Sequence, residues 1–257
     1  MRYAFAAWFL ALGFTAAAAQ SPTAPPVAPK VAALSLIGDR LLVVGSTITT
    51  GSRIDKNAKT ILPLGTDEID VATVLAFEKR ANALRPQLEV VLLRAKDPSI
   101  HQLQDDVIAG KRDFRELLSA VAPLARRAGA THLVLFAKSR GETKIDTGDG
   151  SIGTGYVDGV GFYVDRWLRK RQTPEGEAEV GILAPFAYFK AVVVDLDGLM
   201  VIGEEVSHQA KALYPAANVR EARDPWDYLT ATEKVAALKT LSDQGVEKIA
   251  GRVLGRF

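Results

Sequence analysis

The sequence predicts an α/β (α+β) fold in which helices pack on a mixed sheet. Three observations predict this class. Apolar β-type runs alternate with helical patterns in the first half of the chain, β-rich runs separated by glycine and charged turns fill residues 142–208, and an amphipathic helix ends the chain. We therefore expect a single domain over residues 31–257.

The first 19 residues have the pattern of a secretion signal. Arg2 provides the positive charge, residues 4–14 form an apolar run, and Ala17-Ala18-Ala19 is a small-residue cleavage site. An apolar run of this length is too short to cross a bilayer as a stable helix. Cleavage would leave a chain that begins near Gln20, and the four prolines of residues 20–30 predict a disordered leader.

The domain is expected to open with a β-hairpin. Residues 31–37 and 41–50 are β-rich, and Gly38-Asp39 between them is a two-residue turn sequence. A helix is then expected from Thr66 or Asp67 to residue 84, and a buried strand over residues 88–94.

Two further helices are expected over residues 97–110 and 113–129. Each begins at a capping aspartate and ends at a glycine. Pro123 is expected to kink or divide the second helix because proline lacks the backbone donor. Residues 131–138 form the next predicted strand.

The second half predicts an antiparallel meander and a closing helix. Residues 195–198 supply a turn between two β-rich runs, and residues 148–161 are expected to form a glycine-rich loop. Thr230 and Glu233 make a capping box for the C-terminal amphipathic helix. Its apolar face is formed by Val235, Leu238, Val246, Ile249 and Val253.

Composition excludes several classes of function. The chain has no cysteine, which excludes disulfides, a thiolate nucleophile or metal ligand, and a cysteine-linked lipid anchor. Its 32 basic and 30 acidic residues are nearly balanced, so no general attraction to nucleic acid is expected. Outside the signal, no apolar run is long enough for a transmembrane segment. We expect a soluble periplasmic protein.

Three short motifs are weighed against simpler interpretations. Residues 148–153 match G-x-G-x-x-G, but β-type residues follow where a dinucleotide site needs a helix. Asp146-Thr147-Gly148 matches the aspartic-protease triplet but is favoured to be a hairpin turn. His101, His132 and His208 are widely spaced, so we predict no metal site, no cofactor and no catalytic set.

The best candidate contact surface lies on residues 162–171. On a strand, Tyr163, Trp167 and Arg169 point to one side, while Phe162 and Val164 point to the other. Tyrosine, tryptophan and arginine are enriched at binding hot spots. We predict that Tyr163, Trp167 and Arg169 bind a partner; the alternative is that both faces of the strand are covered.

The order of elements resembles a group of periplasmic α/β domains. Residues 128–136 place a strand after a helix-ending Gly129-Ala130, and residues 189–201 form a long hairpin whose turn carries Asp197 and Gly198. This pattern resembles the curli-secretion lipoprotein, the penicillin-binding-protein activator lipoproteins and the N-terminal domain of the Tol-system propeller protein. The resemblance implies binding of envelope partners without catalysis.

We therefore predict a non-catalytic, exported binding or assembly component of the bacterial cell envelope. Its partner would be an envelope protein or a cell-wall component. The alternatives are a secreted hydrolase whose site residues are scattered along the sequence, and a ligand carrier with a pocket between the final helix and the sheet.

Overall fold

The computed structural model describes residues 29–46, 56–148, 150–170, 179–214 and 224–257, and their side chains except those of 167–170 and 179–180. The predicted signal and nearly all of the leader lie outside these residues. In chain order the elements are β1 (Lys30–Ser35), β2 (Arg40–Gly45), β3 (Ala58–Pro63), α1 (Glu68–Leu84), β4 (Glu89–Leu93), α2 (Pro98–Ile108), α3 (Phe114–Arg127), β5 (His132–Lys138), β6 (Arg140–Glu142), β7 (Ile145–Asp146), β8 (Ser151–Ile152), β9 (Tyr156–Lys170), β10 (Glu179–Asp195), β11 (Met200–Ala210), a short 3-10 helix η2 (Pro225–Tyr228) and α4 (Ala231–Leu254).

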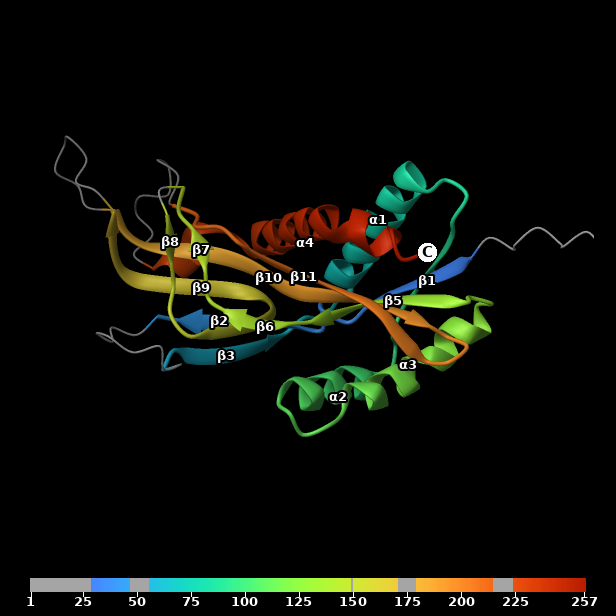
Figure 1. Ribbon diagram of the computed structural model, residues 1–257. Coiled ribbons are helices and arrows are strands. Elements are labelled where there is room, and N and C mark those ends of the chain that lie inside the picture. Colours follow the sequence, from blue (N-terminus) through green and yellow to red (C-terminus); the bar gives the residue numbers. More distant parts are fainter. Residues whose placement is uncertain (1–28, 47–55, 149, 171–178, 215–223) are drawn as a thin grey trace, which may run out of the picture.

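The predicted mixed α/β class is confirmed. A large sheet runs in the order β3-β2-β9-β10-β5-β1-β4, with β11 also paired to β10. Helices α1 and α4 cover one side of the sheet, and α2 and α3 cover the other (Figure 1). No helix of the described residues is long and apolar enough to cross a membrane.

In this sheet β1 and β2 lie end to end, and so do β5 and β9. Side by side, β1 pairs in parallel with β5, and β2 pairs in parallel with β9. β10 is antiparallel to both β5 and β9, so it bridges the two halves of the sheet. Strands β1 and β2 thus form one row that is interrupted at residues 36–39, beside a second row that is interrupted between β5 and β9.

The prediction that the domain opens with a β-hairpin is wrong. Gly38-Asp39 does not reverse the chain, because β1 pairs with β4 and β5 whereas β2 pairs with β3 and β9. The reason lies in α1. Its Asp70 accepts hydrogen bonds from the backbone N–H groups of Ile37 and Gly38, at 2.8 and 3.1 Å, which fixes the bend without a turn.

Three of the helices begin with the predicted side-chain caps, whereas Asp67 at the start of α1 makes no capping hydrogen bond. Asp97 and Asp113 accept hydrogen bonds from the first turns of α2 and α3, and Thr230 forms a capping box with Glu233 at α4. α3 continues through Pro123 and is not divided there. The antiparallel meander is also confirmed, since β10 pairs with β9 and β11.

The glycine-rich segment 148–161 is only partly a loop. β7 and β8 form a small hairpin, and β9 already begins at Tyr156. A Cβ atom at Gly161 would lie 1.9 Å from the carbonyl oxygen of Leu42. Glycine at this position therefore serves the close approach of β2 to β9.

Three apolar clusters hold these layers together. The first lies under α1 and α4, where Phe77, Phe136 and Phe189 pack edge to face at centroid distances of 5.6 and 6.1 Å. The second lies under α2 and α3. The third fills the half of the sheet around β2 and β9, where Ile145 and Ala212 cover it.

Candidate functional site

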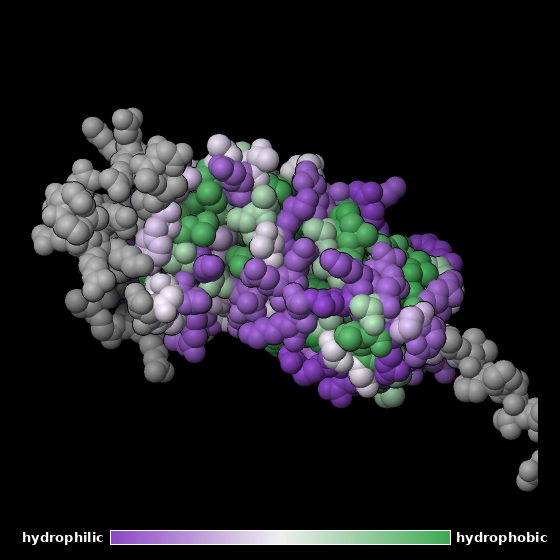
Figure 2. Space-filling model, turned by 90° about the horizontal axis from the view of Figure 1, so that it is seen from above, coloured by the Kyte–Doolittle hydropathy of each residue, from purple (hydrophilic) through white to green (hydrophobic). Residues whose placement is uncertain are grey.

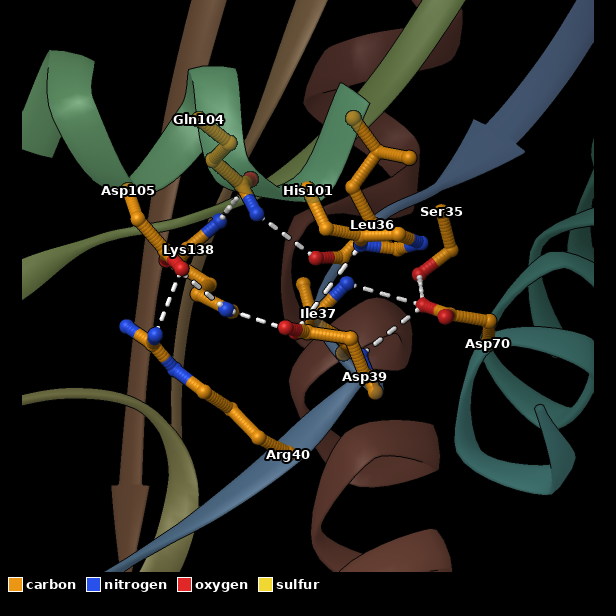
Figure 3. Close-up of polar contacts among 11 residues, drawn as sticks. Ser35, Leu36, Ile37, Asp39, Arg40, Asp70, His101, Gln104, Asp105 and Lys138 are labelled. Atoms are coloured by element: carbon orange, nitrogen blue, oxygen red, sulfur yellow. Dashed lines mark hydrogen bonds and ion pairs between the residues drawn. The ribbon is translucent and has the colours of Figure 1, made fainter. Parts of the chain in front are cut away.

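An enclosed lysine lies where the sheet is interrupted. Lys138 ends β5, and its side chain is 1% exposed. Its Nζ lies 2.6 Å from Oδ1 of Asp39 and 3.1 Å from Oδ1 of Asp105 (Figure 3). The Asp39 contact is an ion pair without the alignment of a hydrogen bond. Nη1 of Arg40 meets the second oxygen of Asp105 at 2.5 Å. Paired carboxylates thus offset the cost of burying this ammonium.

The amide of Gln104 replaces backbone pairing at the interruption. Its Nε2 donates to the carbonyl oxygen of Leu36 at 2.7 Å, and its Oε1 accepts from the backbone N–H of Lys138 at 2.9 Å. Gln104 is 1% exposed and comes from α2. One side chain therefore satisfies a buried acceptor and a buried donor that the interrupted strands leave open.

The carboxylate of Asp70 closes the other side of the interruption. Its Oδ1 accepts from Oγ of Ser35 at 2.6 Å and from the backbone N–H groups of Ile37 and Gly38. Burial raises the pKa of Asp70, against the opposing effect of the Ser35 hydrogen bond. The first turn of α1 is thereby tied to the loop between β1 and β2.

These groups form one assembly, which we call the strand-break cluster: Ser35, Asp39, Arg40, Asp70, His101, Gln104, Asp105 and Lys138 (Figure 3). Nδ1 of His101 lies 3.8 Å from Asp39 and has no hydrogen-bond partner within the described part of the chain. The hydroxyl of Ser35 donates to Asp70 rather than to an imidazole, so it is not arranged as an activated nucleophile. The arrangement joins α1, α2, β5 and the β1–β2 loop.

A cavity of about 300 Å³ adjoins this cluster on the α2 and α3 side. Gln104 and Lys138 contribute to its wall, and Phe114 lines it from α3. Nζ of Lys190 lies 2.9 Å from Glu204 and 4.6 Å from the centre of the Phe114 ring. Lys190 and Glu204 thus form an ion pair beside the ring of Phe114, and Lys138 and Arg140 also line the cavity.

A longer groove runs between α1 and α4 on the opposite side of the sheet. It consists of two adjoining cavities of about 660 and 470 Å³ that share Glu68, Lys239 and Asp243. Nζ of Lys239 lies 3.6 Å from Glu68 across the groove. Leu75 projects into it and is 47% exposed. Figure 2 shows this side of the molecule, where hydrophobic patches lie between hydrophilic residues.

The structure moves one predicted contact residue into the core. Tyr163 is 1% exposed, and its hydroxyl lies 3.3 Å from Oγ1 of Thr154. Phe162 on the other face of β9 is buried as well and packs edge to face on Trp226. Both faces of the strand are therefore covered here, and the expected exposure of Tyr163 is wrong. The side chains of Trp167 and Arg169 lie outside the described residues, so their role stays a prediction.

The three histidines do not converge. His101 belongs to the strand-break cluster, His132 packs against Phe257, and His208 stacks on Tyr188 at 4.2 Å. In the described ranges, no group of three His, Asp or Glu side chains could hold a metal ion. Asp146 accepts from the backbone N–H of Gly148, as the hairpin-turn interpretation of the triplet requires.

Sequence reasoning missed the strand-break cluster because its members come from four separate segments. The one local signal is Lys138, a charged residue that directly follows the apolar run of β5. A lysine in such a position needs a buried partner, but its partners Asp39 and Asp105 lie 99 and 33 positions away in the sequence.

No protein-family model and no curated protein matches this sequence. Several solved structures are similar to it at low identity. A PelC dodecamer from Paraburkholderia phytofirmans is 10% identical with a TM-score of 0.31, covering 91% of this chain and 95% of that one. The hypothetical protein CT253 from Chlamydia trachomatis is 10% identical with a TM-score of 0.33, covering 89% and 97%. Protein XCC0632 from Xanthomonas campestris is 11% identical with a TM-score of 0.31, covering 91% and 86%. At such TM-scores these structures assign no function to the chain, and the resemblance found in the sequence stays a prediction.

Proposed function

We propose that the protein is a non-catalytic binding or assembly component of the bacterial cell envelope, and that it binds its partner in the groove between α1 and α4. The single observation that carries this proposal is the groove itself, with two adjoining cavities, an apolar lining and charged rims. The secretion pattern of residues 1–19 supports the envelope location.

The lining of the groove favours a protein segment over a small polar ligand. Four alanines line it and allow close approach of another backbone: Ala72, Ala76, Ala231 and Ala236. Leu75 offers an exposed apolar anchor point, as in complexes where an amphipathic helix lies in a groove. The rims of the groove carry Glu68 and Asp243 as well as Lys79 and Lys239. The partner that suits this lining is a helix with one apolar face and with both acidic and basic residues beside it.

The strand-break cluster favours a structural role over the hydrolase alternative. The side chains of Arg40 and Lys138 each meet a carboxylate inside the fold. Lys138 lines the cavity on the α2 and α3 side, but its ammonium is held by Asp39 and Asp105, whereas a hydrolase would need such a group to be available to a substrate. The cluster instead holds together the two halves of the sheet on which the α1–α4 groove is built.

Site-specific photocrosslinking tests this proposal. The photoreactive residue p-benzoylphenylalanine is placed at position 75 or 236 in the groove, or at the control position 111, in the full chain exported by a Gram-negative host. Lys111 is 72% exposed and lies between α2 and α3, on the other side of the sheet. We expect one discrete adduct from positions 75 and 236 and none from position 111.

A groove-filling variant separates binding from random contact. Ala72→Trp fills the groove beside position 75, and it should abolish the adduct while the protein level stays the same. Adducts that form equally at position 111, or that persist in the Ala72→Trp background, would contradict binding in the groove.

A further inference from the structure

The cavity beside the strand-break cluster has an apolar side and a charged side. The apolar side comes from α2 and α3, which cover this side of the sheet (Figure 1), and includes Val107, Phe114 and Leu117. The charged side comes from the strands of the sheet. Its volume of about 300 Å³ is at the small end of the range of about 300–1,000 Å³ that is typical of ligand pockets. A ligand that fits here is therefore small and has both an apolar part and a charged part.

The charges that line the cavity favour an anion. Three of the four charged side chains in the lining are basic, namely Lys138, Arg140 and Lys190, and Glu204 is the acidic one. A cleft lined mostly by one sign of charge attracts ligands of the opposite sign. The ammonium of Lys138 is already held by two carboxylates of the strand-break cluster. Lys190 is the basic group whose partner a ligand can replace, because that partner is the half-exposed Glu204.

The uncharged polar side chains of the lining are already engaged within the fold. Both ends of the Gln104 amide are used, by the carbonyl of Leu36 and by the N–H of Lys138. The hydroxyl oxygen of Ser139 lies 3.3 Å from Nε2 of His208. A ligand therefore finds its polar contact at the ion pair between β10 and β11, not at these groups.

Glu204 shows that a carboxylate fits beside Lys190. Its Oε2 accepts from Nζ of Lys190 at 2.9 Å, and the same Nζ lies 4.6 Å from the centre of the Phe114 ring. The side chains of Lys190 and Glu204 are 24% and 43% exposed. An ion pair with this much access to water contributes little to stability. Glu204 can therefore turn into solvent at small cost when another carboxylate takes its place.

We propose that this cavity binds a small carboxylate that carries an apolar chain. The carboxylate of the ligand replaces Glu204 at Lys190, and the chain lies against Phe114 and the other apolar residues of α2 and α3. Lys190 keeps an anionic partner, and the apolar side of the cavity loses its contact with water. The site lies on the other side of the sheet from the α1–α4 groove, so the inference goes beyond the proposed function and does not depend on it.

Isothermal titration calorimetry with sodium octanoate tests this proposal on the protein purified after export by a Gram-negative host. We expect saturable binding of one octanoate per chain. Acetate has the carboxylate without the chain, and octylamine has the chain with the opposite charge. Neither of these two should bind at the concentration at which octanoate saturates the protein.

The two members of the ion pair should have opposite effects on octanoate binding. Lys190→Gln removes the ammonium and should weaken binding by at least about tenfold, as expected for loss of a hydrogen bond between charged groups. Glu204→Gln removes the competing carboxylate and should strengthen binding. Lys239→Gln is the matched control and should leave the affinity unchanged, because Lys239 pairs with Glu68 in the groove on the other side of the sheet.

Thermal unfolding without octanoate shows that the three variants are folded. A general loss of structure would weaken binding in both Lys190→Gln and Glu204→Gln, so the opposite changes identify the site. The proposal is overturned if octanoate does not bind, if octylamine binds equally well, or if Lys190→Gln keeps the affinity of the wild type. Weaker binding by Glu204→Gln or by Lys239→Gln overturns it as well. None of these results bears on photocrosslinking in the groove.

Discussion

Gln104 is the side chain on which the interrupted sheet most depends. It satisfies the carbonyl of Leu36 and the N–H of Lys138 at once, and neither group has another backbone partner at the interruption among the residues that the structure describes. Buried polar groups of this kind are costly to leave open. The side chain of Gln104, which comes from α2, therefore makes the two hydrogen bonds that a strand backbone would otherwise make.

Replacing Gln104 should destabilise the fold strongly. Gln104→Leu leaves one buried donor and one buried acceptor without partners, so we expect the free energy of unfolding to fall by about 2–4 kcal/mol. Gln102 lies on the exposed side of the same helix, and Gln102→Ala should change it by less than about 0.5 kcal/mol. Urea denaturation of both variants measures the difference; similar midpoints for the two would show that the bridge contributes nothing.

Asp70 should give the protein a pH-dependent term in stability. Burial raises the pKa of Asp70 above its unfolded value of 3.8, so the folded state binds its proton more tightly than the unfolded state. The resulting stabilisation is full below the unfolded pKa and is lost as pH rises through the folded pKa. Asp70→Asn removes this pH-dependent contribution, so the stability of the wild type relative to this variant should fall as the pH rises above 3.8, measured by urea denaturation at a series of pH values.

Asp97 provides a control of opposite sign for the same measurement. Its hydrogen bonds from Ser99 lower the pKa of Asp97, so its stabilisation is present above the unfolded pKa and is lost as pH falls through the folded pKa. The wild type relative to Asp97→Asn should therefore gain stability from low pH toward neutrality. Parallel trends for the two variants would contradict the assignment at Asp70.

At the scale of elements, the two interrupted rows decide the shape of the sheet. β1 and β2 continue in one direction, beside β5 and β9, and the single long strand β10 joins both halves. Two strands can follow each other across such an interruption only if the backbone N–H and C=O groups at the break form hydrogen bonds with other partners. α1 and α2 supply these partners through Asp70 and Gln104.

The close approach of β2 and β9 should make Gly161 intolerant of a side chain. A Cβ atom there would overlap the carbonyl of Leu42, so we expect Gly161→Ala to lower the free energy of unfolding by about 1–3 kcal/mol. Gly150 has open space around its Cα, and Gly150→Ala should stay within about 0.5 kcal/mol. If chemical denaturation gives the same loss of stability for Gly161→Ala and Gly150→Ala, the close contact between Gly161 and the backbone of β2 does not exclude a side chain.

At the scale of the whole molecule, the three apolar clusters must hold the fold without crosslinks. The chain has no cysteine, so its stability comes from packing on both sides of one sheet. This is compatible with export to an oxidising compartment, where a protein without thiols is chemically inert toward disulfide exchange.

Export predicts a processed N-terminus. Mass spectrometry of the chain recovered from the periplasm of a Gram-negative host should find Gln20 as the first residue. Ala19→Leu places a large residue at the cleavage site and should leave the signal attached. Recovery of intact chain, Met1 included, from the cytosol would contradict both the location and the proposed envelope role.

Features that depend on neighbours within a few residues could be predicted from the sequence. The caps at Asp97, Asp113 and Thr230 involve contacts two or three positions away, and the structure has all three. The meander likewise follows from turns that join adjacent strands. The sequence by itself therefore determined the helices, their limits and the fold class.

Tertiary structure alone decided where the interrupted strands pair and which polar side chains are enclosed. Tyr163 is buried because Ile145 and Ala212, which come from separate segments, pack in the same cluster, and alternation along β9 carries no information about them. Gly38 bends without a turn because Asp70, 32 positions away, binds its N–H. Such contacts join groups that are distant in the chain, so their energies appear only when the whole sheet has formed.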